Sequence, residues 1–278
     1  MTVSEATSGT VGIDRAQLLD KVVGFVRAAH AEILRVYARP GSAQLKADQS
    51  PLTEADLASH QVLTVALATL QPRLPVLSEE GGLPDAATRA SWPVYWLIDP
   101  LDGTKEFLAR NGEFTVNVAL MEGTRPTLGV VGVPARDQVF VGDVTRGLAQ
   151  RLDVSGVRDL RARRYAGSRP TVVASRRHGG EQLEAALRAI QQAEGPPELR
   201  NIGSALKLCL LAEGEADLYP RLAPTSEWDT AAAQAVLEAA GGAVLQLNGL
   251  PVRYNKPDIL NPHFVAVADP AVNWLRLF

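Results

Sequence analysis

The chain has 278 residues, of which 46% are hydrophobic and 21% are charged, as is typical of a globular protein with one large or two medium-sized domains. Its net charge of −3 and its pI of about 5.9 provide no overall positive field, which argues against a nucleic-acid polymer as the main partner. Cys209 is the only cysteine, so an intramolecular disulfide and a zinc site built from cysteines are both excluded.

The N-terminal segment carries neither the basic nor the apolar region of a secretory signal, and the longest near-apolar run, residues 62–70, is too short to span a bilayer. We therefore expect a cytoplasmic protein with no transmembrane segment. Peripheral association with the inner face of the membrane, and the choice between a monomer and a homodimer, stay open at this point.

The first half of the chain predicts two helices packed on a largely antiparallel sheet. After a flexible leader at residues 1–12, apolar residues at helical spacing predict a long helix from about Asp14 to Tyr37. A polar loop at 46–56 leads into a second helix, for which Thr53 and Asp56 form a capping-box start. Strands are expected at 75–77, 94–98, 114–120 (half-buried), 127–133, 138–144 and 148–154, with a polar excursion at 83–91.

The second half predicts a smaller α/β unit. We interpret the basic stretch 158–164 as a solvated linker and place a domain boundary beside it, with domains at 1–155 and 156–278. Strands are expected at 171–174, 216–219, 243–247 and 264–268, and helices at about 181–192, 204–214 and 229–240.

The most informative stretch is residues 95–107. An apolar strand ends at Asp99, and Pro100 removes a backbone donor, so we expect the strand to stop there. Asp99, Asp102 and the carbonyl of Leu101 would then project from a tight turn, and such oxygen donors suit Mg²⁺ or Mn²⁺. The N–H groups of Gly103 and Thr104, at the start of the next helix, could hold a phosphate oxygen.

Further carboxylates stand at the ends of predicted elements, namely Asp48, Glu79 and Asp229. Hydrolysis of a phosphate ester with two metal ions explains the whole set. Asp99 would bridge the ions, Glu79 and the Leu101 carbonyl would complete one site, and Asp102 and Asp229 the other. Thr104, oriented by Asp48, would help to deprotonate the attacking water.

These motifs resemble the signatures of the inositol monophosphatase superfamily. The resemblance rests on residues 99–104 (DPLDGT), 78–80 (SEE) and 228–232 (WDTAA), in this order and at wide spacing. Residues 48–53, 105–107, 111–117, 203–207 and 219–221 are similar to the 3'(2'),5'-bisphosphate nucleotidases of the CysQ type. The resemblance implies a two-domain α-β-α-β-α sandwich, of mixed α+β and α/β class, with the metal ions at the domain junction.

The resemblance also implies an activity and the residues that perform it. Enzymes of this type hydrolyse adenosine 3',5'-bisphosphate to AMP and phosphate, and usually also its sulfated relative PAPS, with Mg²⁺ and with inhibition by Li⁺; this recycles adenosine 3',5'-bisphosphate in sulfur assimilation. Two or three Mg²⁺ ions are implied, with Mn²⁺ as the alternative. The metal ligands would be Glu79, Asp99, Leu101, Asp102 and Asp229, with Asp48 and Thr104 activating water. The nucleotide would be held by Ser204, Lys207 and Arg221, joined by Ser175 and His178, and the substrate would also contact Gly103, Thr104 and Asp229. Domain 1–155 would thus carry most metal ligands, and domain 156–278 would carry Asp229 and the nucleotide-binding residues.

Two other hypotheses about the function stay open. An inositol-phosphate or sugar-phosphate phosphatase would use the same metal site, but it has no second phosphate for Lys207 and Arg221 to bind. A non-catalytic nucleotide-binding module would be expected to lack a metal ligand, and every ligand is present. Ala205 replaces a serine found in many relatives, and Lys105 and Glu106 are interpreted as a solvated helix face.

Overall fold

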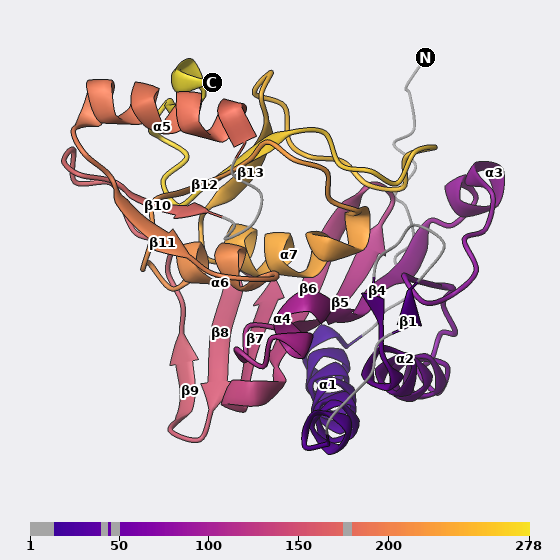
Figure 1. Cartoon of the computed structure of the whole chain (residues 1–278). Coiled ribbons are helices and arrows are strands. Elements are labelled where there is room, and N and C mark those ends of the chain that lie inside the picture. Colours follow the sequence, from indigo (N-terminus) through magenta and orange to yellow (C-terminus); the bar gives the residue numbers. More distant parts are fainter. Residues whose placement is uncertain (1–13, 40–43, 46–50, 175–179) are drawn as a thin grey trace, which may run out of the picture.

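The protein folds into five layers, helix, sheet, helix, sheet and helix, as the computed structural model in Figure 1 shows. The structure describes residues 14–39, 44–45, 51–174 and 180–278. The leader expected at 1–12, part of the polar loop, Asp48, Ser175 and His178 lie outside these residues. The α-β-α-β-α sandwich expected from the sequence is confirmed.

The outer layer of the first half consists of helices α1 (Arg15–Tyr37) and α2 (Glu54–Leu67). The Asp14 carboxylate caps α1 by accepting hydrogen bonds from the amides of Ala16 and Gln17. The predicted capping box of α2, between Thr53 and Asp56, is present. The apolar stripe of each helix packs on the sheet beneath, and the buried set includes Val22, Val26, Ile33, Leu63 and Leu67.

The large sheet has seven strands in the order β3-β4-β5-β6-β7-β8-β9, and only the β3–β4 pair is parallel. The strands are β3 (Val76–Ser78), β4 (Val94–Asp102), β5 (Thr115–Glu122), β6 (Arg125–Val133), β7 (Gln138–Asp143), β8 (Leu148–Asp153) and β9 (Gly156–Asp159). The short elements β1 (Gln44–Leu45), β2 (Pro51–Leu52), α3 (Ala86–Ala90), α4 (Thr104–Leu108) and η1 (Pro134–Arg136) connect or flank them. Helix α3 forms within the stretch expected to be a polar excursion.

The second sheet has five strands in the order β11-β10-β12-β14-β13. Its strands are β10 (Thr171–Ala174), β11 (Glu198–Asn201), β12 (Leu218–Arg221), β13 (Ala243–Gln246) and β14 (Phe264–Val267). Helices α6 (Leu206–Ala212) and α7 (Ala231–Ala239) lie between the two sheets, with η2 (Glu227–Asp229) leading into α7, while α5 (Gly180–Glu194) and η3 (Trp274–Leu277) lie on the outer side (Figure 1). Strand β11 had no sequence prediction. No helix among the described residues is long and apolar enough to cross a membrane.

Strand β4 runs further than the sequence predicted, because it continues through Pro100 to Asp102. Its pairing with β5 is interrupted between Asp99 and Asp102, so Pro100 lies where the ladder requires no donor. On the other side, the pairing of β4 with β3 ends at Ile98. The expectation that the strand stops at Asp99 was therefore wrong, although the two carboxylates still lie at its irregular end.

Both faces of β5 are buried, whereas a half-buried strand was predicted. Val116 and Val118 face α1 and α2, and Ala119 and Met121 belong to the core shared with α6 and α7. That core also contains Phe264 of the second sheet. The two halves of the chain therefore share one continuous apolar interior.

Helix α7 approaches the large sheet at a pair of glycines. Gly129 in β6 and Gly142 in β7 are direct cross-strand partners. A Cβ atom on Gly129 would lie 2.0 Å from the carbonyl oxygen of Ala232, and one on Gly142 would lie 2.5 Å from the Cα of Val236. The helix backbone thus rests directly on the strand backbones, with no side chain between them.

The stretch 158–164 is not a solvated linker. Its first residues complete β9 in the large sheet, and Leu160 is buried. The Arg163 guanidinium donates to both carboxylate oxygens of Asp217, at 2.8 and 2.5 Å, and Arg164 pairs with Asp269 at 2.8 Å. These ion pairs attach the stretch to the second half of the chain. They were not predicted, because the partners are distant in sequence and local composition does not reveal them. The domain boundary at 155/156 stays a prediction.

Buried His30 makes stability dependent on pH. Its ring packs on Gly132, and burial lowers its pKa to about 4, against the opposing effect of Asp137 and with a smaller contribution from Arg27. The folded pKa lies below the unfolded value of 6.5, so this contribution is intact above 6.5 and is lost as the pH falls toward 4. We expect His30 to account for a loss of about 2 kcal/mol between about pH 7.5 and about pH 5.

Urea unfolding of the wild type and of His30→Met at both pH values measures this loss. The variant, whose side chain does not titrate, should lose less stability than the wild type over the interval. Equal losses in the two proteins would contradict the role of His30.

Candidate active site

The acidic residues of the site are carried by three elements that end at one place. Asp99 and Asp102 lie at the end of β4, Glu79 directly follows β3, and Asp229 ends η2 in front of α7. The Glu79 amide donates to the carbonyl of Ile98 at 3.2 Å, which keeps Glu79 beside the end of β4. The pairing of β3 and β4 and the packing of α7 therefore bring carboxylates together from residues 79 to 229.

The backbone around Asp99 is fixed by hydrogen bonds. Asp99 Oδ1 accepts from the Leu101 amide at 3.0 Å, and the hydroxyl of Ser59 in α2 donates to the Pro100 carbonyl at 2.7 Å. Asp99 is buried, with 1% of its surface exposed. These bonds leave Asp99 little freedom to turn away from its acidic neighbours.

The four carboxylates interact electrostatically. The pKa of Asp99 is raised well above its usual value, first by burial and then by the charges of Glu79, Asp102 and Asp229. Burial, Asp102 and Glu79 raise the pKa of Asp229 to about 8. Burial also raises the pKa of Asp102, while Lys207 opposes this shift. A group of like charges in a buried place is unfavourable unless a cation neutralises it.

The chemistry of this set fits a hard divalent cation. The available donors are carboxylate oxygens and the Leu101 carbonyl, which Mg²⁺ and Mn²⁺ prefer. Among the residues that the structure describes, no three His, Cys, Asp or Glu side chains are gathered around one point closely enough to hold an ion as they stand. The charges of Glu79, Asp102 and Asp229 nevertheless all raise the pKa of Asp99, so these three carboxylates lie within electrostatic reach of it.

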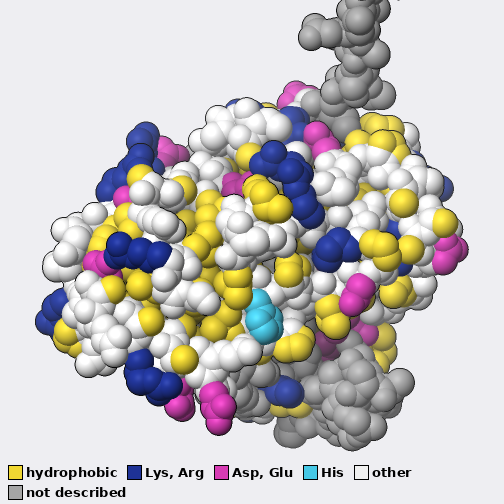
Figure 2. Space-filling view, turned by 90° about the horizontal axis from the view of Figure 1, so that it is seen from above, with side chains coloured by type: hydrophobic (Ala, Val, Ile, Leu, Met, Phe, Trp, Pro, Cys, Tyr) yellow, Lys and Arg dark blue, Asp and Glu magenta, His cyan; other side chains and the backbone are white. Residues whose placement is uncertain are grey.

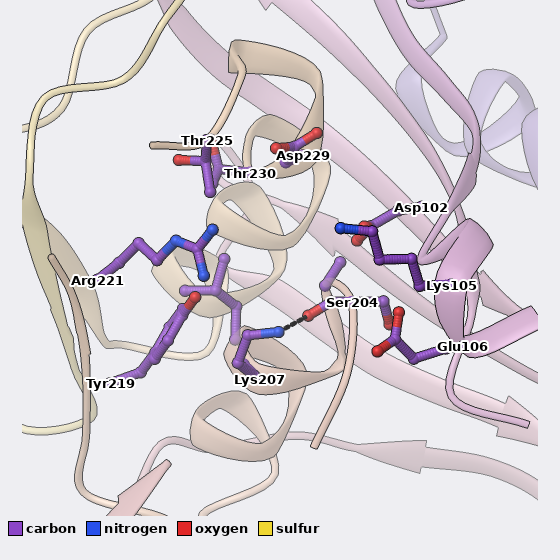
Figure 3. A pocket seen from close by; sticks show the side chains of 12 residues that line it. Asp102, Lys105, Glu106, Ser204, Lys207, Tyr219, Arg221, Thr225, Asp229 and Thr230 are labelled. Carbon is purple, nitrogen blue, oxygen red and sulfur yellow. Dashed lines mark hydrogen bonds between the residues drawn. The ribbon is translucent and has the colours of Figure 1, made fainter. Parts of the chain in front are cut away.

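A pocket whose lining combines acidic and basic side chains, Asp102 and Asp229 among them, is drawn in Figure 3. Its cavity has a volume of about 120 Å³. The side chains labelled around it in the figure are those of Asp102, Lys105, Glu106, Ser204, Lys207, Tyr219, Arg221, Thr225, Asp229 and Thr230. The structure thus brings together Ser204, Lys207 and Arg221, three of the residues predicted to bind the nucleotide, next to two predicted metal ligands.

Lys207 and Arg221 are both largely buried, at 7% and 9% exposed. Lys207 Nζ donates to the Ser204 carbonyl at 2.7 Å, and it lies 5.6 Å from the centre of the Tyr219 ring. Arg221 donates to the carbonyls of Ala223 and Pro224. Burial lowers the pKa of Lys207 to about 8, with Asp102 opposing the shift, so the ammonium form still predominates at neutral pH.

The backbone around Ser204 is held in an unusual conformation. Ser204 has a φ of 50°, in the left-handed region that non-glycine residues rarely adopt. The preceding amide, that of Gly203, donates to Glu113 Oε2 at 2.9 Å, which anchors this loop to the start of β5. Gly103, with a φ of 91°, opens α4 opposite it, and a Cβ atom there would lie 3.4 Å from the Cβ of Ser204.

Thr104 has a partner that the sequence did not suggest. Its hydroxyl donates to Oδ1 of Asp56 at 3.3 Å, while Asp56 Oδ2 accepts from the amide and the hydroxyl of Thr53. The predicted partner, Asp48, lies outside the described residues. The sequence predicted Asp56 only as the last residue of a capping box. Its burial, with 1% exposed, could not be read from a polar loop.

Other pocket residues were also missed. Glu106 is half-buried and lines the pocket, so its interpretation as part of a solvated helix face was wrong, whereas Lys105, which also lines the pocket, is exposed as expected. Tyr219 belongs to the segment 219–221 that carried the resemblance, but it received no role. Thr230 lies within the motif 228–232 and Thr225 lies three residues before it, and that proximity was the available signal.

Comparisons with known proteins agree with this site. The model of the inositol monophosphatase family matches residues 14–273. The 3'(2'),5'-bisphosphate nucleotidase CysQ of Shigella flexneri is 45% identical over 250 residues, which cover 89% of this chain and 98% of the relative. The protein of the same name from Escherichia coli K12 is 44% identical over 253 residues, with the same coverage.

A solved structure shows the same fold. The crystal structure of CysQ from Bacteroides thetaiotaomicron, described as a bacterial member of the inositol monophosphatase family, matches with a TM-score of 0.80 and 38% identity. The match covers 90% of this chain and 97% of that one. With the acidic residues at the ends of β3, β4 and η2, these matches establish that the chain is a member of the inositol monophosphatase family.

Proposed function

We propose that this protein is a Mg²⁺-dependent 3'(2'),5'-bisphosphate nucleotidase that converts adenosine 3',5'-bisphosphate to AMP and phosphate, and that also acts on PAPS. The observation that carries the proposal is the buried pair Lys207 and Arg221 directly beside the acidic group containing Asp102 and Asp229. A bisphosphate needs two such neighbouring places, one for each phosphate. The names of the relatives at 44 and 45% identity support the same substrate class.

On the acidic side, Glu79, Asp99, Asp102, Asp229 and the Leu101 carbonyl would hold two or three Mg²⁺ ions, or Mn²⁺ in their place. Such ions, when bound, lower the pKa of a water molecule and stabilise a leaving oxygen. The protein supplies the negative charge that makes this binding favourable. The charges of all three other carboxylates raise the pKa of Asp99, which supports its role as the bridging ligand.

The hydroxyl of Thr104 would accept a hydrogen bond from the attacking water and take up its proton while passing its own proton to the Asp56 carboxylate. For this its own proton must point away, and its bond to Asp56 Oδ1 provides that direction. The capping box holds Asp56 from the other side through Thr53. We therefore assign to Asp56 the orienting role that the sequence suggested for Asp48, while Asp48 stays a candidate.

On the basic side, Lys207 and Arg221 would bind the phosphate that is not hydrolysed. Arg221 has two of its donors on backbone carbonyls, which fixes the plane of its guanidinium. Ser204 and the amides of Gly103 and Thr104 would contact the nucleotide from the opposite wall, and Ser175 and His178 would join them. The cytoplasmic location, peripheral membrane contact and the choice between monomer and homodimer stay predictions.

The test is phosphate release with Mg²⁺ from adenosine 3',5'-bisphosphate and from inositol 1-phosphate, side by side and with Li⁺ added. We expect a strong preference for the nucleotide in kcat/KM and inhibition by Li⁺. In Lys207→Met the preference should collapse through a higher KM for the nucleotide, with the inositol ester unaffected. A preference of the wild type for the inositol ester would instead establish the alternative, an inositol or sugar-phosphate phosphatase. Nucleotide binding without any phosphate release would establish a non-catalytic module.

A further inference from the structure

Asn117 is a buried polar residue in the middle of β5 for which the proposed mechanism has no use. It is 1% exposed, and its direct neighbours across the sheet are Asp99 in β4 and Val131 in β6. Direct partners on antiparallel strands have their side chains on the same face, about 5 Å apart at Cβ. The register therefore places the Asn117 amide beside the carboxylate of Asp99.

The face on which Asn117 lies is the one toward the active site. Alternate residues of β5 share a face, and Ala119 and Met121, at the next positions of this series, belong to the core with α6 and α7. Val116 and Val118 belong to the opposite core under α1 and α2. Asn117 thus points to the layer that carries Asp229, and an apolar residue would be the ordinary choice there.

Asp102 also lies near this amide, because Asp102 is the direct cross-strand partner of Thr115. Thr115, two residues earlier on the same face, donates to Asp102 Oδ2 at a long 3.4 Å. Neither Nδ2 nor Oδ1 of Asn117 has a hydrogen bond of full geometry to any group in the described part of the chain. A buried amide in this condition indicates that the arrangement is completed by something that enters the site.

We propose that Asn117 is a positioning residue for the acidic group: when a divalent cation binds there, the amide N–H groups of Asn117 donate to Asp102 and orient that carboxylate. Asparagine suits this place because it donates without adding charge. An aspartate would add another like charge to the group, and a leucine of similar size would donate nothing. The inference rests on the acidic group being a cation site, as the proposed function requires, and it does not depend on the identity of the substrate.

The test measures Mg²⁺ binding without substrate. The thermal unfolding midpoint of the full chain is recorded against Mg²⁺ concentration for the wild type and for Asn117→Leu. We expect the midpoint of the metal-free variant to equal or exceed that of the wild type, since an unpaired amide is removed. The Mg²⁺ concentration for half-maximal stabilisation should rise roughly 10- to 100-fold. Met121→Leu, on the same strand and face, is the matched control and should leave that concentration unchanged.

The opposite pattern would overturn the proposal. If Asn117→Leu lowers the metal-free midpoint and leaves the Mg²⁺ dependence as in the wild type, Asn117 only fills the core. Should leucine prevent folding, Asn117→Ala, which is too small to clash, is read in the same way. A preference of the wild type for another phosphate ester would contradict the proposed substrate, but it would not affect the role proposed for Asn117 in Mg²⁺ binding.

Discussion

Replacing Asp99 by asparagine is expected to stop turnover, with a fall in kcat of roughly 10³-fold or more, and at the same time to make the metal-free protein more stable. The loss follows from removing the charge that would bridge the metal ions. The gain follows because Asp99 is buried beside Glu79, Asp102 and Asp229, and asparagine removes one of these like charges. The amide oxygen of asparagine can still accept from Leu101 as Asp99 Oδ1 does.

Two measurements on the same sample check this expectation. Thermal unfolding in the presence of a chelator should give a higher midpoint for Asp99→Asn than for the wild type, and added Mg²⁺ should stabilise the variant much less. Asp85→Asn is the matched control, because Asp85 is an exposed helix cap that asparagine can replace. Near-normal turnover in Asp99→Asn would remove Asp99 from the metal site.

Asp56→Asn is expected to lower kcat by roughly 10²- to 10⁴-fold while leaving Mg²⁺ binding nearly unchanged. Asp56 uses one carboxylate oxygen for Thr53 and the other for Thr104. Asparagine has a single acceptor oxygen, so one of these two contacts is lost. Either the Thr104 hydroxyl is then no longer held in its orientation, or the cap of α2 is lost at a cost of about 1 kcal/mol in stability.

Thr53→Ala separates the two roles of Asp56. It removes the hydroxyl of the capping box and should cost about 1 kcal/mol, but it leaves the bond from Thr104 to Asp56 in place. We therefore expect kcat of Thr53→Ala to stay close to that of the wild type, as measured by phosphate release at saturating Mg²⁺. A loss of kcat in Thr53→Ala as large as that in Asp56→Asn would show that only the local fold matters.

The sequence predicted the parts of the fold and site that depend on local patterns. The helical periodicity of α1, the Thr53–Asp56 cap and most strands were found because each is a property of neighbouring residues. The acidic residues Glu79, Asp99, Asp102 and Asp229 were found because they stand at the ends of recognisable elements. Ser204, Lys207 and Arg221 came from the resemblance, and the structure places all three around one pocket.

The parts that escaped prediction depend on partners far away in the chain. Pro100 is tolerated inside β4 because neither β3 nor β5 pairs with β4 at that residue, and the local sequence does not reveal this pairing. The contact of Thr104 with Asp56 joins residues 48 positions apart. The arginines of 158–164 looked like a solvated linker because Asp217 and Asp269 are more than fifty residues away. The position of Asn117 beside Asp99 likewise follows only from the register of β5 against β4.

The paired glycines beneath α7 have a consequence for how this enzyme can change by mutation. Gly129 and Gly142 touch no substrate and contribute no chemical group, yet even a methyl group at either would collide with the backbone of α7. Moving that helix outward would carry Asp229, which lies two residues before it, away from Asp99 and Asp102. Natural selection on catalysis therefore acts on two positions that have no side chain, and these should be as resistant to replacement as the carboxylates themselves.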